Sequence, residues 1–140
     1  MVGVLDAIDA VVFFGLRGVA PIRIFQSIAS GLLGRAAFQG GVATAALGVA
    51  LHFFIAFVIV TTFVIASARM HLLTRHAVVF GLLYGVLAYA VMNLVVVPLS
   101  AAGRPSFAAP VLVNGLLIHA LGIGLPSALF ARAAADRRRT

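Results

Sequence analysis

The chain contains no cysteine, and this absence removes several kinds of chemistry at once. Disulfide bonds, thiolate metal sites, iron–sulfur clusters and covalent attachment of c-type haem all require cysteine side chains. The sequence also lacks a nucleophile elbow, a phosphate-binding loop, a zinc-protease motif and a dinucleotide-binding motif. We therefore expect a protein that is not an enzyme.

Charged side chains are scarce. Only 9% of the 140 residues are charged and 64% are hydrophobic, with a mean hydropathy of +1.21. So little polar surface cannot cover a soluble globule, which predicts an integral membrane protein. All ten basic residues are arginines at the ends of apolar segments, and the net charge is +7. This distribution favours the lipid bilayer as partner and argues against nucleic acid.

A basic N-terminal region, which begins a cleavable signal peptide, is also missing. Asp6 and Asp9 lie inside the first apolar stretch instead, so we expect this stretch to remain in the protein. Apolar segments predict one transmembrane domain, 1–140, with spans at about 2–20, 42–68, 77–98 and 110–131. At about 1.5 Å per residue the second of these exceeds the roughly 30 Å hydrocarbon core. The first is short, and if it does not cross, three spans remain.

Residues 21–34 have a different pattern. Pro21 suits the first position of a helix, and apolar side chains then recur at helical spacing opposite a polar face. About 14 residues are too few to span a bilayer. We therefore expect an all-α fold, an integral membrane four-helix bundle with a short amphipathic interfacial helix between the first two spans.

The arginines predict the orientation of the chain. Two spans separate the 69–76 connection from the C-terminal tail, so these segments share one side. The other four arginines lie on the opposite side. The 69–76 connection and the tail together hold six: Arg69, Arg75, Arg132, Arg137, Arg138 and Arg139. Because cytoplasmic loops carry the excess of basic residues, we expect a cytoplasmic C-terminus.

Glycines recur at helical spacing within the predicted spans. Small residues on one face let the backbone of another helix approach closely. We expect six glycines to serve in helix packing: Gly41, Gly48, Gly81, Gly85, Gly115 and Gly122.

Two histidines lie near the middle of spans that run in the same direction. His52 follows Gly48 by four residues, His119 follows Gly115 by four, and each sits about ten residues after its span begins. The two imidazoles are therefore expected at nearly the same depth, about 15 Å from the boundary, where they could face one another.

Three interpretations of these histidines stay open. They could be neutral hydrogen-bonding groups that join helices, with Asn93 bonding across to a neighbouring helix. They could form an inward polar set with Asn93 and Asp9 that supports proton or small-solute passage. The two carboxylates have a separate interpretation, in which Asp6 and Asp9 both cap their helix in the headgroup region.

The third interpretation makes His52 and His119 the axial ligands of a b-type haem, as in a haem-binding or accessory subunit of a larger membrane complex. Two histidines alone would leave a metal site incomplete, so no metal is expected. The exposed apolar surface of so small a bundle is compatible with a homo-oligomer.

The chain also resembles a family of small bacterial polytopic inner-membrane proteins without an assigned activity. The resemblance is carried by RGVAPIRIFQSIASGLLG, by TAALG followed by ALHFFIAF, by GLLYG and MNLVVVPLS, and by VNGLLIHALGIGLP. More distantly, the last three spans are similar to YagU-like proteins, in a mid-span histidine, an opening GLL-x-G and a closing Pro-Leu. This resemblance implies a bacterial inner-membrane location and a role in acid or stress response.

Overall fold

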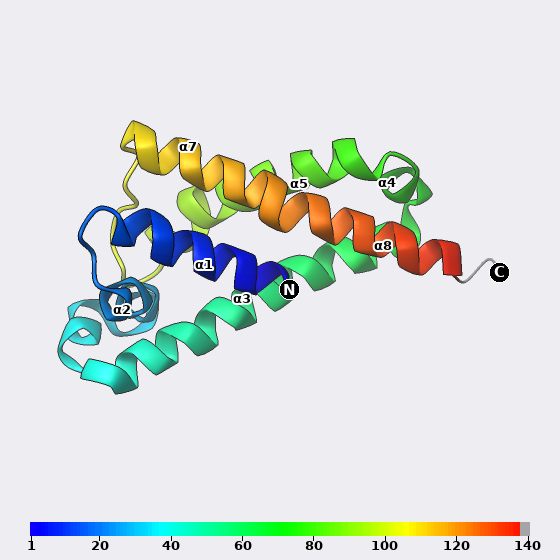
Figure 1. Ribbon diagram of the computed structural model, residues 1–140. Helices are drawn as coiled ribbons and strands as arrows, with labels where there is room; N and C mark the ends of the chain where they lie inside the picture. The colour runs from blue at the N-terminus through cyan, green and yellow to red at the C-terminus, as the bar shows by residue number, and fades with distance from the viewer. Residues whose placement is uncertain (138–140) are drawn as a thin grey trace.

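The computed structural model describes residues 1–137, and within them every regular element is helical (Figure 1). Two segments, η2 and η3, are π-helical turns inside longer helices, and η1 is a 3₁₀ helix. The elements in order are α1 (Val2–Gly15), α2 (Pro21–Leu33), η1 (Gly34–Gln39), α3 (Gly41–Arg69), α4 (His71–Arg75), α5 (Ala77–Val91), η2 (Met92–Val96), α6 (Val97–Leu99), α7 (Ala109–Leu117), η3 (Ile118–Gly124) and α8 (Leu125–Arg137).

Within residues 1–137, three helices are long and apolar enough to cross a membrane. They are α3 with 29 residues, the continuous helix Ala77–Leu99 with 23, and the continuous helix Ala109–Arg137 with 29. The expected membrane protein is confirmed at this level, because each of these helices exceeds the roughly 20 residues that a span requires. Each also matches a predicted span closely in position.

Helix α1 is shorter than its predicted range, 2–20. It has 14 residues and ends at Gly15, after which Gly18 takes a positive φ of 81° in the turn that leads to α2. Fourteen residues extend about 21 Å, less than the roughly 30 Å of a hydrocarbon core. In the described part of the chain three helices therefore have spanning length, and the predicted bundle of four spans is not confirmed. Helix α1 is shorter and packs against α3 and η3.

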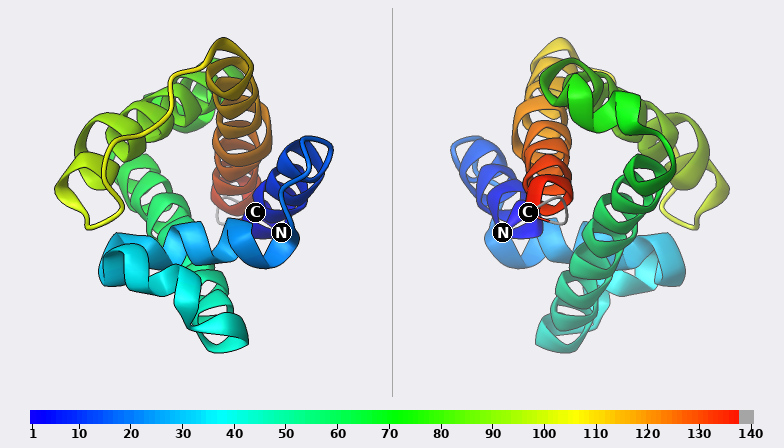
Figure 2. Two further views of the ribbon diagram at one scale, coloured as in Figure 1. Left: turned by 90° about the vertical axis from the view of Figure 1, so that its left-hand side faces the viewer. Right: turned by 90° about the vertical axis from the view of Figure 1, so that its right-hand side faces the viewer.

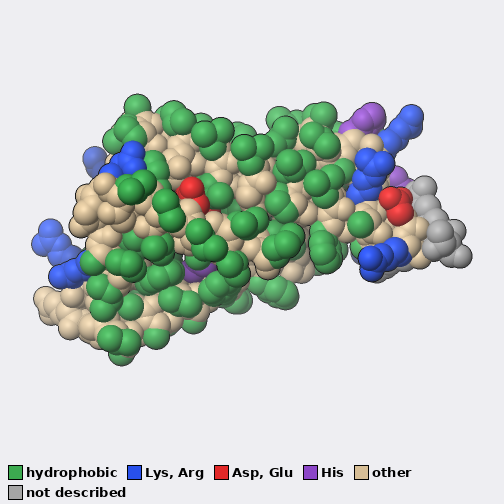
Figure 3. All heavy atoms as spheres, in the orientation of Figure 1, with side chains coloured by type: hydrophobic (Ala, Val, Ile, Leu, Met, Phe, Trp, Pro, Cys, Tyr) green, Lys and Arg blue, Asp and Glu red, His purple; other side chains and the backbone are tan. Residues whose placement is uncertain are grey.

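The bundle has two distinct ends (Figure 1). At the α2 end lie the C-terminus of α1, helix α2 and the connection between α6 and α7. At the α8 end lie α4 and the last residues of α8. Hydrophobic side chains cover most of the surface between them, and arginines gather at both ends (Figure 3). Arg138 and Arg139, which belong to the arginine group predicted to be cytoplasmic, lie outside the described residues.

Helix α2 runs across the α2 end of the bundle rather than along it (Figure 2). Its observed bounds, Pro21–Leu33, agree with the predicted amphipathic helix, and Gly34 ends it with a φ of 57°. The side chain of Gln26 is buried at 2% exposure and donates to the carbonyl of Gly41 at 3.0 Å. Burying a carboxamide is tolerated here because the start of α3 accepts its hydrogen bond.

Glycines bring several helix backbones together. At Gly48 an added Cβ would overlap the carbonyl oxygen of Phe25, so this glycine seats α2 on α3. At Gly85 it would overlap the carbonyl oxygen of His119, and at Gly81 it would crowd Gly124 and its neighbours. Helix α5 therefore packs against η3 and α8 at backbone distance, as small residues permit.

The remaining predicted packing glycines are placed differently. Gly115 makes room for the ring of Tyr89, and Gly122 lies against Ile118 of its own helix. Gly41 has open space around its Cβ position among the described residues and a φ of 56°. Its requirement for glycine is therefore the backbone turn from η1 into α3, rather than contact with another helix.

The best-packed apolar cluster lies in the half of the bundle toward the α8 end. Phe63 of α3 is 1% exposed and packs with alanines of α5 and α8. The ring of Tyr84 lies 4.9 Å from that of Phe63, centroid to centroid, and its hydroxyl donates to the carbonyl of Ile59 at 2.6 Å. This cluster separates the middle of the bundle from the α8 end.

Candidate functional site

A pocket of about 320 Å³ lies in the middle of the bundle, lined by residues of α1, α2, α3, η2, α6 and η3. Its polar lining comes from four of these elements, and the rest of the lining is apolar. The polar lining residues, which we call the central polar site, are Asp6, His52, Asn93 and His119.

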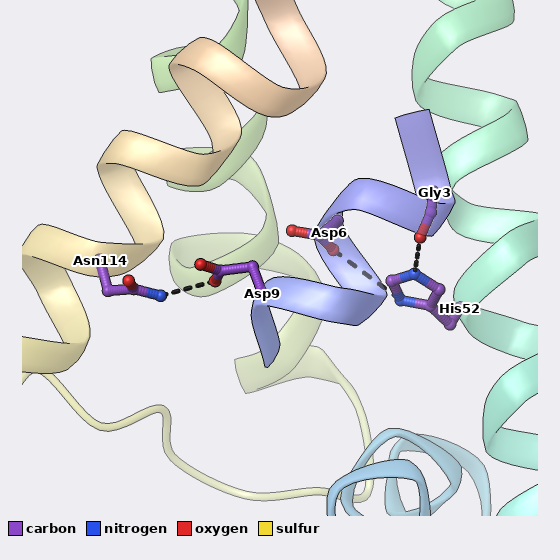
Figure 4. Close-up of polar contacts among 5 residues, drawn as sticks. All are labelled: Gly3, Asp6, Asp9, His52 and Asn114. Atoms are coloured by element: carbon purple, nitrogen blue, oxygen red, sulfur yellow. Dashed lines mark hydrogen bonds and ion pairs between the residues drawn. The ribbon is translucent and has the colours of Figure 1, made fainter. Parts of the chain in front are cut away.

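His52 is held between two groups of α1 (Figure 4). Its Nε2 lies 2.8 Å from the carbonyl oxygen of Gly3, and its Nδ1 lies 3.9 Å from Oδ2 of Asp6. Only 10% of the His52 side chain and 20% of the Asp6 side chain are exposed. The close approach of α1 follows from Gly3, where a Cβ would lie 3.0 Å from the Phe53 ring.

The hydrogen bond to Gly3 determines how the His52 ring is protonated. A carbonyl oxygen can only accept, so Nε2 must carry a hydrogen and donate it. In the neutral ring Nδ1 then holds a lone pair that faces the carboxyl group of Asp6. The 3.9 Å between Nδ1 and Oδ2 is longer than a hydrogen bond, so Asp6 and His52 form an ion pair only when Nδ1 is protonated as well.

His119 approaches the site from the opposite side, on η3. Its Nδ1 is buried without a hydrogen-bond partner of normal geometry among the described residues, and the nearest backbone group that acts on the ring is the carbonyl of Gly115, one turn earlier. The ring lies 5.3 Å from that of Tyr89 in an edge-to-face arrangement. It also interacts electrostatically with Asp6, Asp9 and His52. A buried ring nitrogen without a good partner is unusual in a purely structural histidine.

Asn93 lies on η2 and lines the same cavity. The expectation that it bonds across to a neighbouring helix is wrong, because its Nδ2 donates to the carbonyl of Tyr89, 3.0 Å away and one turn earlier. A π-helical turn loosens the regular backbone pairing, which leaves carbonyl groups open to such side-chain donors. Asn93 therefore presents its carboxamide to the cavity instead of joining two helices.

Asp9 does not line the cavity, although it faces the bundle. Its Oδ2 accepts a hydrogen bond of 2.7 Å from Nδ2 of Asn114 on α7 (Figure 4). Asp6 and Asp9 therefore turn to different neighbours: Asp6 to α3 and Asp9 to α7. Neither is confined to capping its own helix, since both contact other helices.

Three of the four residues expected in the inward polar set, His52, His119 and Asn93, thus line one cavity. Their common depth was visible in the sequence because both histidines follow the start of a span by about ten residues. Asp6 lines the cavity in place of Asp9, and Asp9 instead bonds to Asn114. The spacing of Asp6 and Asp9 predicts that both lie on one helix face, but it does not predict which residues of other helices they contact.

The arrangement gives the haem alternative no support. The Nε2 of His52 is occupied by the Gly3 carbonyl, and its Nδ1 faces Asp6 rather than His119. Helix α1 packs against both α3 and η3, the two elements that carry the histidines. A haem would require both rings to direct a nitrogen at one iron. In residues 1–137 no three histidine, cysteine or acidic side chains group as metal ligands.

Comparison with protein-family models, with curated proteins and with solved structures finds no match for this chain. The class that the fold defines is a helical membrane protein with a polar site between apolar helices.

Proposed function

We propose that this protein passes protons across a membrane by protonation and deprotonation of the central polar site. The observation that carries the proposal is the cavity that gathers two imidazoles, a carboxyl group and a carboxamide between membrane-length helices. Ionisable groups are costly at this depth, and where they occur they commonly mark proton or ion routes.

The chemistry of the site supports a proton as the species that moves. The Asp6–His52 pair accommodates one proton on either partner, because Nε2 of His52 is already engaged by Gly3. His119 lines the same pocket, and its buried Nδ1 has no hydrogen-bond partner of normal geometry among the described residues. Histidine changes its charge close to neutral pH, so a short chain of these groups can exchange protons without large motions.

The surrounding residues favour slow, carrier-like transfer over an open pore. Phe14 and Ile28 bound the cavity toward the α2 end, and Ile59 and Ile123 bound it toward the α8 end. Beyond the latter lies the packed cluster around Phe63. A proton therefore crosses these apolar layers only when the helices separate transiently, which limits the rate and excludes larger solutes.

We further propose a bacterial inner-membrane location with the α8 end in the cytoplasm. Among the described residues four arginines lie toward each end, and the sequence adds Arg138 and Arg139 directly after the last helix, so the segments that follow the spans toward α8 have the larger basic count, as cytoplasmic segments do. The helix α1 then forms the fourth member of the bundle, and the large hydrophobic outer surface is compatible with association of several copies.

The experiment is a proton-flux assay in liposomes that contain a pH-sensitive dye. The purified protein should dissipate an imposed pH gradient faster than protein-free liposomes when the membrane potential is clamped. His52→Gln should reduce the flux to the protein-free rate, because a glutamine can still donate to the Gly3 carbonyl but does not titrate. Asp6→Asn should have the same effect.

His76→Ala is the matched control, since His76 is exposed and lies between α4 and α5 rather than in the site. It should keep the wild-type flux. Wild-type flux at the protein-free rate, or unchanged flux in His52→Gln, would refute the proposal and leave the histidines as groups that join helices. Circular dichroism and gel filtration verify that each variant is folded.

A further inference from the structure

A second polar hollow, of about 370 Å³, lies at the α8 end, far along the bundle from the central polar site. Arg75 and His71 line it from the α4 side, and Arg132 and Asp136 line it from α8. We call it the arginine pocket. It sits where the hydrophobic surface gives way to arginines, which is the level of the phosphate groups in a bilayer (Figure 3).

The charges of the arginine pocket suit an anion. Arg75 and Arg132 outweigh the single carboxylate of Asp136, which leaves one net positive charge before any protonation of His71. Arg132 and Asp136 approach only to 4.0 Å with both side chains more than half exposed, so this ion pair is weak and easily rearranged. Two guanidinium groups offer planar forks of N–H donors that match phosphate oxygens.

Apolar side chains beside the pocket point to a lipid rather than a free anion. Leu72 lines the pocket and is 51% exposed. Leu129 is 44% exposed and precedes Arg132 by three residues, so both lie on one face of α8. An acyl chain that runs along this face toward the middle of the bundle would place its headgroup at the two arginines.

We propose that the arginine pocket binds the phosphate group of an anionic phospholipid, with Arg75 and Arg132 as the donors. Basic pockets between membrane helices on the cytoplasmic side recognise lipid headgroups in this way. The site is independent of proton transfer, because it shares no lining residue with the central polar site.

The test measures lipid selectivity of the whole protein in phosphatidylcholine nanodiscs by electron paramagnetic resonance. The quantity is the association constant of spin-labelled phosphatidylglycerol relative to spin-labelled phosphatidylcholine. An arginine near the headgroups contributes about fivefold to such association. The double variant Arg75→Gln/Arg132→Gln removes two such arginines and should therefore lower the ratio by about 25-fold.

Arg35→Gln/Arg104→Gln is the matched control, because it removes the same charge from exposed positions at the α2 end that do not line the pocket; it should lower the ratio by much less than the first double variant. An equal fall in both double variants would overturn the proposal. Asp136→Asn should raise the ratio, since it removes the one opposing charge. An unchanged ratio in the first double variant, or a fall in Asp136→Asn, would overturn the proposal. Full displacement of the labelled lipid by inorganic phosphate would also overturn it, in favour of a site for the free anion.

Discussion

The carboxylate of Asp9 accepts a hydrogen bond of 2.7 Å from the carboxamide of Asn114, which lies 105 residues later in the chain. This contact joins α1 to α7, while Asp6 and Gly3 join the same helix to His52 on α3. Helix α1 is thus held by polar groups on both sides. Its position decides whether Asp6 reaches the central polar site.

Removing the Asn114 side chain should loosen α1. We expect Asn114→Ala to lower the free energy of unfolding in detergent by about 2 kcal/mol, because a hydrogen bond to a carboxylate is lost and that carboxylate remains partly buried. A double-mutant cycle with Asp9→Ala should give a coupling energy of at least about 1 kcal/mol. Asn93→Ala is the comparison, since its carboxamide bonds only within its own helix. Purely additive effects of the two variants would contradict a direct contact.

Gly48→Ala should displace α2 from α3. The added methyl group would overlap the Phe25 carbonyl oxygen, and overpacking of this kind costs about 1–3 kcal/mol. Denaturant unfolding followed by circular dichroism measures the loss. Gly15→Ala places the same methyl group in open space and should change stability by less than about 1 kcal/mol. Equal stability of the two variants would show that α2 is not seated at Gly48.

Gly85→Ala should reduce both stability and proton flux. Its methyl group would overlap the carbonyl of His119, so η3 must shift and move the imidazole out of place. Gly81→Ala crowds Gly124 and Ala128, one turn away from the site on the same helix pair. We expect a comparable loss of stability there but a smaller loss of flux. If the two variants lose flux equally, the effect arises from general loosening of the bundle.

Tyr84→Phe should cost about 1 kcal/mol of stability, because it removes the hydrogen bond from the hydroxyl group to the Ile59 carbonyl. The ring still packs on Phe63, so the apolar layer is preserved. Proton flux in liposomes should therefore match the wild type. Loss of flux in this variant would instead assign the tyrosine hydroxyl to the proton route.

Much of the fold could be predicted from the sequence because its long helices are uninterrupted apolar runs. The span predicted at 42–68 is observed as Gly41–Arg69. It begins at a turn glycine and ends at the first arginine that follows the apolar run. The first helix was harder to delimit. Residues 16–20 contain Leu16, Val19 and Ala20 as well as Arg17, and the positive φ of Gly18 places this stretch in a turn.

The central polar site could be predicted in part. The depth of a residue along a helix follows from its distance in sequence from the start of the helix, and this distance predicts a similar depth for His52 and His119. Which nitrogen of His52 is occupied depends on where α1 packs, and residue counting does not contain that information. Gly124 is a further packing residue, which the glycine spacing does not predict: a Cβ there would overlap the Gly81 carbonyl oxygen. A regular repeat of 3.6 residues does not extend through a π-helical turn.

Asn93 and His119 both lie on π-helical turns, η2 and η3. Such a turn holds an additional residue, which rotates everything beyond it by about 100° relative to a regular α-helix. Deleting one residue from 92–96 or 118–124 would restore the ordinary helix but turn its later half away from its neighbours. Changes in chain length should consequently be tolerated in the connection between α6 and α7 and be disruptive within these two short stretches.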